Sequence, residues 1–160
     1  ETETGMAKRD DDTFDLDGFL PYLLNQAAEA ASRSFQTIYK AAYGLTRPQW
    51  RVLANLGRFG AMSATDICRI SHMEKTKVSR AVTALEAEGW LVRSPSPDDR
   101  RVEILTLTEG GQAVFADLGR RAAAYDRMLR AELGPEMTYR LDDLLRGIIA
   151  NGPAGNVDQE

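Results

Sequence analysis

Cysteine and histidine are scarce in this sequence, which holds only Cys68 and His72 among its 160 residues. A single cysteine cannot form an internal disulfide, and this scarcity is typical of proteins kept in a reducing compartment. One cysteine and one histidine also fall short of the ligand sets from which protein metal sites are usually built. We therefore expect no metal, and no cofactor, because a glycine-rich phosphate loop is also missing.

Long apolar runs are missing as well. No run approaches the roughly 18 residues that a bilayer-spanning helix needs, and no signal peptide opens the chain. These absences predict a cytoplasmic protein without a membrane partner. No catalytic residue is expected either, because the chain has no nucleophile elbow and no second histidine to act as a base.

An excess of positive charge is the third absence. The formal net charge is −4, whereas proteins that bind nucleic acids are often basic. Residues 63–106 contain seven Lys or Arg and seven Asp or Glu, so this part is not basic in total. Affinity for a nucleic acid would therefore depend on local clustering of cations, and it would fall strongly as salt rises.

The most informative stretch is Glu74 to Gly89. Val78, Val82 and Leu85 recur at helical spacing and predict one buried stripe. The opposite face carries cations and small hydroxyl residues, and no acid occurs at 75–85. Cations neutralise phosphates and small hydroxyls reach phosphates or base edges, so this helix suits a DNA major groove about 12 Å wide.

The flanking residues complete a recognisable arrangement. A shorter helix is predicted at 63–70, and a tight turn at 71–73 makes the two helices cross steeply, as in a helix-turn-helix. Strand-like segments follow at 90–93 and 101–107, and in the second of them alternate residues share one face: Val102, Ile104 and Thr106. The polar, proline-containing loop at 94–100 joins these strands. Such a hairpin behind a recognition helix is a wing suited to an adjacent minor groove.

Several side chains of this unit are candidates for DNA contact. Arg80 is the best candidate for a base edge, because its fork matches guanine O6 and N7. Phosphate contacts are more fitting for the small hydroxyls. The complete predicted set is Ser71, Lys75, Thr76, Lys77, Ser79, Arg80, Arg100 and Arg101. The alternative is a solvated charged face, which most charge runs are.

Helices with apolar stripes are predicted on both sides of this unit. Their apolar faces are larger than a small winged unit can cover. One interpretation is a monomeric helical lid that packs only on itself and on the winged unit. The other is a homodimer, in which two recognition helices lie about one duplex turn apart on a near-palindromic operator.

The segment Leu85–Gly111, LEAEGWLVRSPSPDDRRVEILTLTEGG, resembles the wing signature of the MarR family of winged helix-turn-helix regulators. Upstream, Leu45–Leu56, LTRPQWRVLANL, is similar to the family's second helix, and the resemblance extends over about 17–149. It implies a homodimeric repressor released from double-stranded DNA by a small-molecule effector. It also implies that Arg101 enters the minor groove and that Asp99 holds it by a charge-assisted contact.

Members of this family take small aromatic or acidic effectors where the long first helix meets the winged unit. The polar and aromatic residues predicted at this junction are Tyr22, Asn25, Arg33, Tyr39, Trp50 and Arg51, and an arginine there could pair with a carboxylate. The alternative is that the aromatics are ordinary core and the arginines ordinary surface. Some family members sense oxidants through a cysteine near the start of the first long helix. That position has no cysteine here, so Cys68 is expected to be a small buried apolar residue.

The predicted fold is mainly α (α+β), a winged helix-turn-helix at about 46–108 with a two-stranded β-wing. Dimerisation helices at about 17–43 and 108–150 complete one domain over 17–150, and the tails at 1–16 and 151–160 are expected to be loose. Met6 is a candidate natural start, which leaves open whether residues 1–5 are native. The predicted function is a sequence-specific DNA-binding transcriptional regulator. The alternative is a helical ligand-carrying or partner-binding protein whose winged domain does not bind DNA.

Overall fold

The structure is a computed structural model that describes residues 13–152, so most of the two predicted tails lies outside the described residues. The elements, in chain order, are α1 (Leu20–Tyr43), α2 (Arg47–Phe59), β1 (Met62–Ser63), α3 (Ala64–Ser71), α4 (Lys75–Ala87), β2 (Leu91–Pro95), β3 (Glu103–Leu107), α5 (Glu109–Leu133) and α6 (Pro135–Asn151). Within 13–152, no helix has both the length and the apolar character that crossing a membrane requires.

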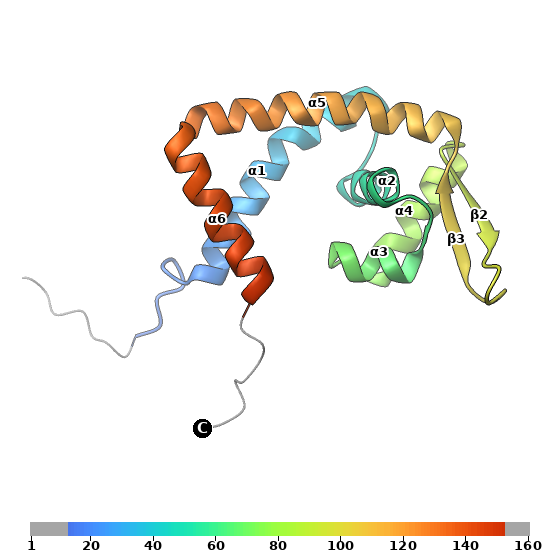
Figure 1. The fold of residues 1–160 in the computed structure, drawn as a ribbon, viewed down its shortest axis with the longest axis horizontal. Coiled ribbons are helices and arrows are strands. Elements are labelled where there is room, and N and C mark those ends of the chain that lie inside the picture. The colour runs from blue at the N-terminus through green and yellow to red at the C-terminus, as the bar shows by residue number, and fades with distance from the viewer. Residues whose placement is uncertain (1–12, 153–160) are drawn as a thin grey trace, which may run out of the picture.

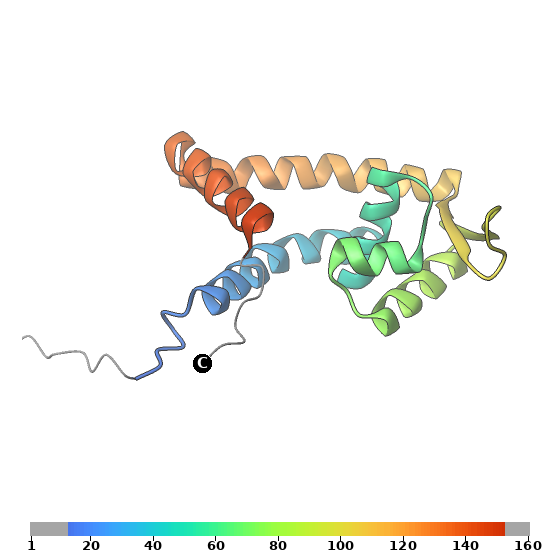
Figure 2. The ribbon, with the colours of Figure 1, turned by 60° about the horizontal axis from the view of Figure 1, so that its bottom comes forward.

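Helix α5 is the axis on which the other elements are arranged (Figure 1). The hairpin of β2 and β3 leads into one end of α5, and α6 turns back from its other end. Helices α2, α3 and α4 form a compact cluster beneath the hairpin end, and α1 crosses behind this arrangement. Figure 2 shows the same separation from a second direction, with the tri-helical cluster at one end and α6 at the other.

The winged unit is built around the stripe that the sequence predicts on α4. Val78, Val82 and Leu85 are at most 1% exposed, which confirms that this face is core. They pack with apolar residues of α2 and of the sheet, including Leu53 and Leu105, in one continuous cluster. This burial turns the opposite, hydrophilic face of α4 outward.

The sheet has three antiparallel strands in the order β1-β3-β2, one more than the predicted two-stranded wing. Strand β1 has only two residues, too few for the alternating pattern by which strands are recognised in a sequence. Leu105 and Leu107 form the buried face of β3. The alternating residues that the sequence predicts to share one face, Val102, Ile104 and Thr106, lie on the opposite side. Val102 precedes the strand and is 40% exposed.

Side-chain caps fix the starts of the helices that carry the winged unit. Ser63 and Asp66 form a reciprocal capping box on α3, and Thr46 does the same with Gln49 on α2. Thr108 caps α5, and its hydroxyl also donates to the Gly89 carbonyl oxygen at 2.7 Å. The end of α4 and the start of α5 are thereby joined at the base of the wing.

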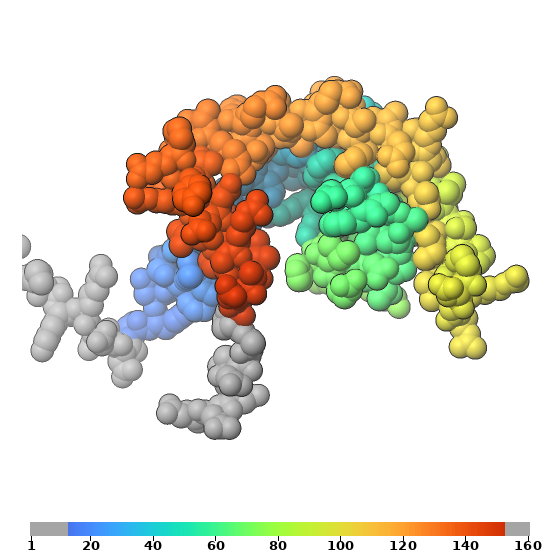
Figure 3. All heavy atoms as spheres, in the orientation of Figure 1, coloured from blue at the N-terminus to red at the C-terminus, as the bar shows by residue number. Residues whose placement is uncertain are grey.

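The outer helices carry apolar side chains that the chain itself leaves uncovered. Helix α6 has no buried residue, and Leu144 on it is 64% exposed. The first half of α1 is similar, with Leu20 56% exposed. In Figure 3, α6 and the beginning of α1 project away from the α2–α4 cluster and leave an open hollow beneath α5. Two short contacts tie α6 to α5, since Arg130 donates to Asp142 at 2.8 Å and Thr138 donates to the Arg130 carbonyl oxygen at 3.2 Å.

Candidate nucleic-acid interface

Helices α3 and α4 form a helix-turn-helix whose turn is the segment 72–74. His72 closes α3 in the left-handed conformation, with φ 52° and ψ 41°, and its backbone N–H donates to the Cys68 carbonyl oxygen. This conformation reverses the chain within one residue, so α4 can begin at Lys75. Cys68 is partly buried against the core, close to its expected role as a small apolar residue.

The exposed face of α4 gathers most of the predicted DNA contacts. Five of them lie exposed on this helix: Lys75, Thr76, Lys77, Ser79 and Arg80. Ser71 is the exception, because it is only 6% exposed and its hydroxyl donates to the Ile67 carbonyl oxygen. Its position at the inner end of α3 turns it towards the core. The geometry therefore removes Ser71 from the set of candidate phosphate contacts.

The tip of the wing is held by its own backbone and by Asp99. The Ser96 N–H donates to the Val102 carbonyl oxygen at 2.8 Å, and the Val102 N–H donates to the Asp99 carbonyl oxygen at 3.0 Å. Asp99 Oδ1 accepts the backbone N–H of Arg101 at 3.0 Å. The carboxylate thus contacts Arg101 through its backbone, which leaves the guanidinium groups of Arg100 and Arg101 at the surface.

The α4 face and the wing tip open onto one groove. Polar side chains from β1, α3, α4 and the hairpin line it together: Ser63, Thr65, Lys75, Ser79, Arg93, Arg100, Arg101 and Glu103. Glu103 is the one acid among these lining residues. Lys75 and Arg101, which are 26 positions apart in the sequence, therefore face the same groove. Such clustering lets several cations contact one polyanion.

Arg93 joins the wing to α4, a role that the sequence did not reveal. Its guanidinium donates to Thr83 Oγ1 at 3.0 Å, to Glu86 Oε2 at 3.1 Å and to Glu103 Oε2 at 3.3 Å. One signal was present, because Arg93 lies two residues after Leu91 and therefore on the buried face of β2. An arginine on such a face needs acceptors from a neighbouring element, and here α4 supplies two of them.

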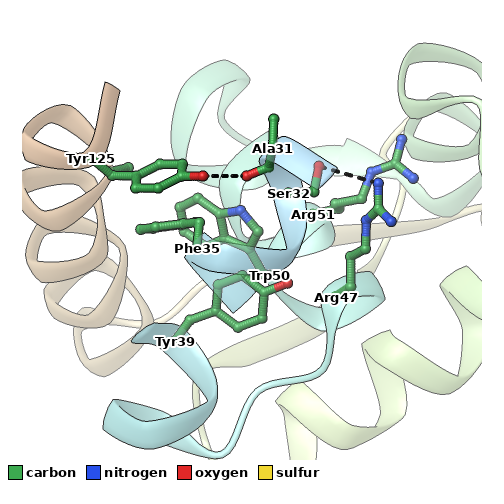
Figure 4. A pocket seen from close by; sticks show the side chains of 9 residues that line it. Ala31, Ser32, Phe35, Tyr39, Arg47, Trp50, Arg51 and Tyr125 are labelled. Atoms are coloured by element: carbon green, nitrogen blue, oxygen red, sulfur yellow. Dashed lines mark hydrogen bonds between the residues drawn. The ribbon is translucent and has the colours of Figure 1, made fainter. Parts of the chain in front are cut away.

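A second feature is a cavity of about 510 Å³ between α1, α2 and α5, which Figure 4 shows from close by. Four aromatic rings form its wall. Phe35 contacts Trp50 and Tyr125 at centroid distances of 5.4 and 5.5 Å, and Tyr39 stacks on Trp50 at 5.8 Å. The hydroxyl of Tyr125 donates to the Ala31 carbonyl oxygen at 2.5 Å, which ties α5 to α1 across the cavity.

The structure brings together three of the six predicted ligand-binding residues in this cavity: Tyr39, Trp50 and Arg51. Asn25 lines a neighbouring polar cavity, which Arg51 also borders. Tyr22 and Arg33 line neither of these two cavities, and Arg33 is an exposed residue at 3.9 Å from Glu29 of the same helix. Arg47, Phe35 and Tyr125 line the aromatic cavity but were not predicted, because only the packing of three helices places them together.

Two arginines form the polar end of the aromatic cavity. Arg47 donates to Glu29 at 2.5 Å and to the hydroxyl of Ser32 at 3.3 Å, and Arg51 donates to the Ser71 carbonyl oxygen. Burial lowers the pKa of Arg51 from its usual value, and the charge of Arg47 lowers it further. Burial raises the pKa of Tyr39. The cavity therefore combines aromatic walls with a cationic end.

A helix-turn-helix, a hairpin behind it and a cationic groove between them define a winged helix-turn-helix DNA-binding protein. A family model described as the MarR family matches residues 43–102. The regulator FarR of Neisseria gonorrhoeae is 32% identical over 123 residues, covering 76% of this chain and 83% of its own. The homoprotocatechuate degradative operon repressor of Escherichia coli is 28% identical over 139 residues, covering 87% of this chain and 93% of its own. The chain belongs to the MarR family of transcriptional regulators.

Solved structures agree with this assignment. The MarR family regulator SPO1453 of Silicibacter pomeroyi DSS-3 has a TM-score of 0.73 at 35% identity, covering 87% of this chain and 98% of its own. NadR in complex with 4-hydroxyphenylacetate gives 0.71 at 26% identity, with coverages of 85% and 96%. BpsR of Bordetella bronchiseptica, whose DNA binding is regulated by 6-hydroxynicotinic acid, gives 0.74 at 25% identity, with coverages of 89% and 99%. The relatives are transcriptional regulators rather than enzymes.

Proposed function

We propose that the protein is a homodimeric repressor that binds a near-palindromic operator through the groove between α4 and the wing. The observation that carries this proposal is the shared exposure of Lys75, Ser79, Arg100 and Arg101 on one groove. A major groove accepts the hydrophilic face of α4, and the adjacent minor groove accepts the wing tip. The protein acts by binding alone, without catalysis.

The proposed contacts divide by chemistry. Arg80 is exposed on α4 and reads a guanine edge, whereas Lys75 and Lys77 neutralise phosphates. Thr76 and Ser79 donate to phosphate oxygens. Asp99 keeps the wing tip in shape, so that the Arg101 guanidinium reaches into the minor groove.

Two copies of the chain supply the symmetry that a near-palindromic site demands. Exposed apolar side chains gather on α6 and on the beginning of α1, and a groove lined by Leu133, Leu141 and Leu145 lies between α5 and α6. A second copy that inserts its own α1 or α6 there removes this apolar surface from water. In this proposal residues 46–108 read DNA, and the helices within 17–43 and 108–150 hold the dimer.

We propose further that the aromatic cavity takes a small aromatic carboxylate as effector. Its walls suit one ring, and its arginines suit a carboxylate. NadR binds 4-hydroxyphenylacetate and BpsR responds to 6-hydroxynicotinic acid, and both compounds carry a ring and an acid group. The effector would bind better to a dimer whose two α4 helices are wrongly spaced for the operator. Its binding would therefore reduce the fraction of dimers that can bind DNA.

The test measures binding to the duplex upstream of the protein's own gene by fluorescence anisotropy, at several salt concentrations. A repressor of this kind binds that duplex more tightly than a scrambled duplex, and log affinity falls linearly with log salt. Either of the two aromatic acids should raise the melting temperature and weaken operator binding. A chain that binds ring carboxylates but no duplex would instead be a ligand carrier, and the repressor proposal would fail.

A further inference from the structure

Arg51 borders two cavities at once. On one side it lines the aromatic cavity, together with Ser32, Trp50 and Tyr125. On the other side it lines a polar cavity between α1, α2 and the helix-turn-helix, which contributes His72, Met73, Glu74 and Lys77. Arg47 of the same helix, α2, also borders both cavities, but of the two only Arg51 donates a hydrogen bond to the helix-turn-helix. Arg51 thus lies between the proposed effector site and the start of α4.

A hydrogen bond connects Arg51 to the turn before α4. Its guanidinium donates to the carbonyl oxygen of Ser71, the last residue of α3. The last carbonyl groups of a helix have no partner within the helix, so this contact satisfies a group that would otherwise need water. The first turn of α4 has no such support of its own, because its N-cap Glu74 makes no side-chain cap. Arg51 therefore supports the end of α3 and the turn that leads into α4, whose first helical turn carries Lys75 and Lys77.

The charge of the Arg51 guanidinium is not balanced by a nearby carboxylate among residues 13–152. Its neighbour Arg47 pairs with Glu29 at 2.5 Å, but within residues 13–152 no carboxylate lies within ion-pair distance of Arg51. Arg51 is partly buried and lies near a second cation, and both conditions disfavour its charge. An anion that enters the aromatic cavity would relieve this cost, and Figure 4 shows the two arginines on the same side of that cavity as Ser32.

We propose that Arg51 is the positioning residue that couples the cavity to the DNA-reading helix. A carboxylate in the aromatic cavity pairs with the Arg51 guanidinium and draws it from the Ser71 carbonyl oxygen. The turn at 72–74 then loses its side-chain support, and the α4 face is no longer held at the angle that the major groove requires. This proposal rests on the proposed repressor function and identifies the contact through which an effector acts.

The first test needs no effector, because a carboxylate can be built into the cavity wall. Ser32 already accepts a hydrogen bond from Arg47 at 3.3 Å, so Ser32→Asp places a negative charge beside the arginines. Ser32→Asn adds a side chain of the same shape without the charge. We expect Ser32→Asp to bind the operator about tenfold more weakly than Ser32→Asn, a ratio within the usual range of allosteric coupling.

The second test asks whether this effect passes through Arg51. In an Arg51→Met background, the ratio between Ser32→Asp and Ser32→Asn should fall to about one, because the guanidinium that relays the charge is gone. Arg51→Met alone should speed hydrogen exchange of the amides at 72–78 and weaken operator binding severalfold. Arg58→Met, on an exposed arginine of the same helix, is the control for losing one positive charge from α2.

Two results would overturn the proposal that Arg51 couples the aromatic cavity to α4. One is a tenfold effect of Ser32→Asp that persists in the Arg51→Met background, and the other is an Arg51→Met protein whose exchange at 72–78 matches that of Arg58→Met. The latter comparison remains decisive if Ser32→Asp fails to fold, which circular dichroism reports. Failure of the effector proposal looks different, because 4-hydroxyphenylacetate would then stabilise the parent protein no more than its neutral amide does. The variant comparisons do not depend on that outcome.

Discussion

Arg93 of β2 and Glu86 of α4 form an ion pair, with Nε and Oε2 3.1 Å apart, and this pair sets the wing against the DNA-reading helix. The same guanidinium reaches Thr83 one turn earlier on α4. Because Arg93 belongs to the hairpin and its two partners belong to α4, these contacts help to set the angle between the hairpin and α4. Each partner can be removed without touching a side chain proposed to contact DNA.

Glu86→Gln distinguishes two effects of Glu86 on operator binding: its position as a partner of Arg93, and the repulsion between its negative charge and DNA. Removing an acid near DNA should by electrostatics alone tighten operator binding, whereas loss of the Arg93 partner should loosen the wing and weaken binding. We expect binding about threefold weaker, as befits an exposed ion pair worth less than about 1 kcal/mol. Glu88→Gln makes the same charge change without a wing partner and is the control. Equal tightening by both variants, measured by anisotropy, would argue against a positioning role for Glu86.

Arg101→Ala should weaken operator binding and flatten its salt dependence. If the guanidinium lies among phosphates of the minor groove, its loss reduces the slope of log affinity against log salt by about one. Arg127→Ala, on an exposed arginine of α5 that does not line the groove, should leave the slope as it is in the parent. An unchanged slope for Arg101→Ala would mean that the wing tip does not reach the duplex.

The double change Lys77→Ala and Arg80→Ala should weaken operator binding and also relax its base preference. A bidentate arginine–guanine pair discriminates against a wrong base by about 1–3 kcal/mol, so mutated operators should compete better with the parent sequence once Arg80 is lost. Binding to a panel of single-base operator variants measures this effect. A double variant that keeps the parent's ranking of these operators would place base reading elsewhere.

Leu144→Glu should dissociate the proposed dimer. Leu144 is 64% exposed on α6, and burying a leucine contributes about 1.5–3 kcal/mol, counted twice in a symmetric interface. Sedimentation should show a shift towards monomer, with operator binding at least about tenfold weaker. Gln112→Glu adds the same charge at an exposed position near the wing end of α5 and should remain dimeric. A dimeric Leu144→Glu protein would exclude this part of α6 from the interface.

The capping box of α3 predicts a pH dependence of stability. Hydrogen bonds from the Ser63 hydroxyl at 2.9 Å and from the Ser63 backbone lower the pKa of Asp66 below its usual value of 3.8. A lowered pKa contributes stability that is present above the unfolded-state value and is lost as pH falls through the folded-state value. Asp66→Asn should therefore lower the melting temperature by about 2 °C at pH 7, and by less below about pH 4. Asp143→Asn is the control, and an Asp66→Asn deficit that does not shrink in acid would contradict this assignment.

Local pattern was sufficient to predict the helix-turn-helix and the hairpin behind it. The helical spacing of Val78, Val82 and Leu85 identified the buried side of α4, and therefore its exposed side. The change to an alternating pattern after Gly89 identified the hairpin, and its loop residues identified the wing tip. These signals repeat over several residues, so one misplaced residue does not hide them.

The features that pattern missed depend on contacts between distant segments. Strand β1 exists because two residues pair with Ile104 and Leu105, and such a short pairing leaves no periodicity. Ser71 was a plausible phosphate ligand by residue type, but the crossing of α3 and α4 buries it. The aromatic cavity shows the same limit, since Tyr39, Trp50 and Arg51 line it whereas Tyr22 and Arg33 do not.

Helix α5 is one uninterrupted rod from the base of the wing to the junction with α6. Its 25 residues span about 37 Å at 1.5 Å per residue. A rod of that length converts a tilt of roughly 5° at one end into a displacement of about 3 Å at the other, close to the spacing of successive base pairs. Small rearrangements where two subunits meet would thus be amplified mechanically into a misplacement of the hairpin by about one step along the duplex.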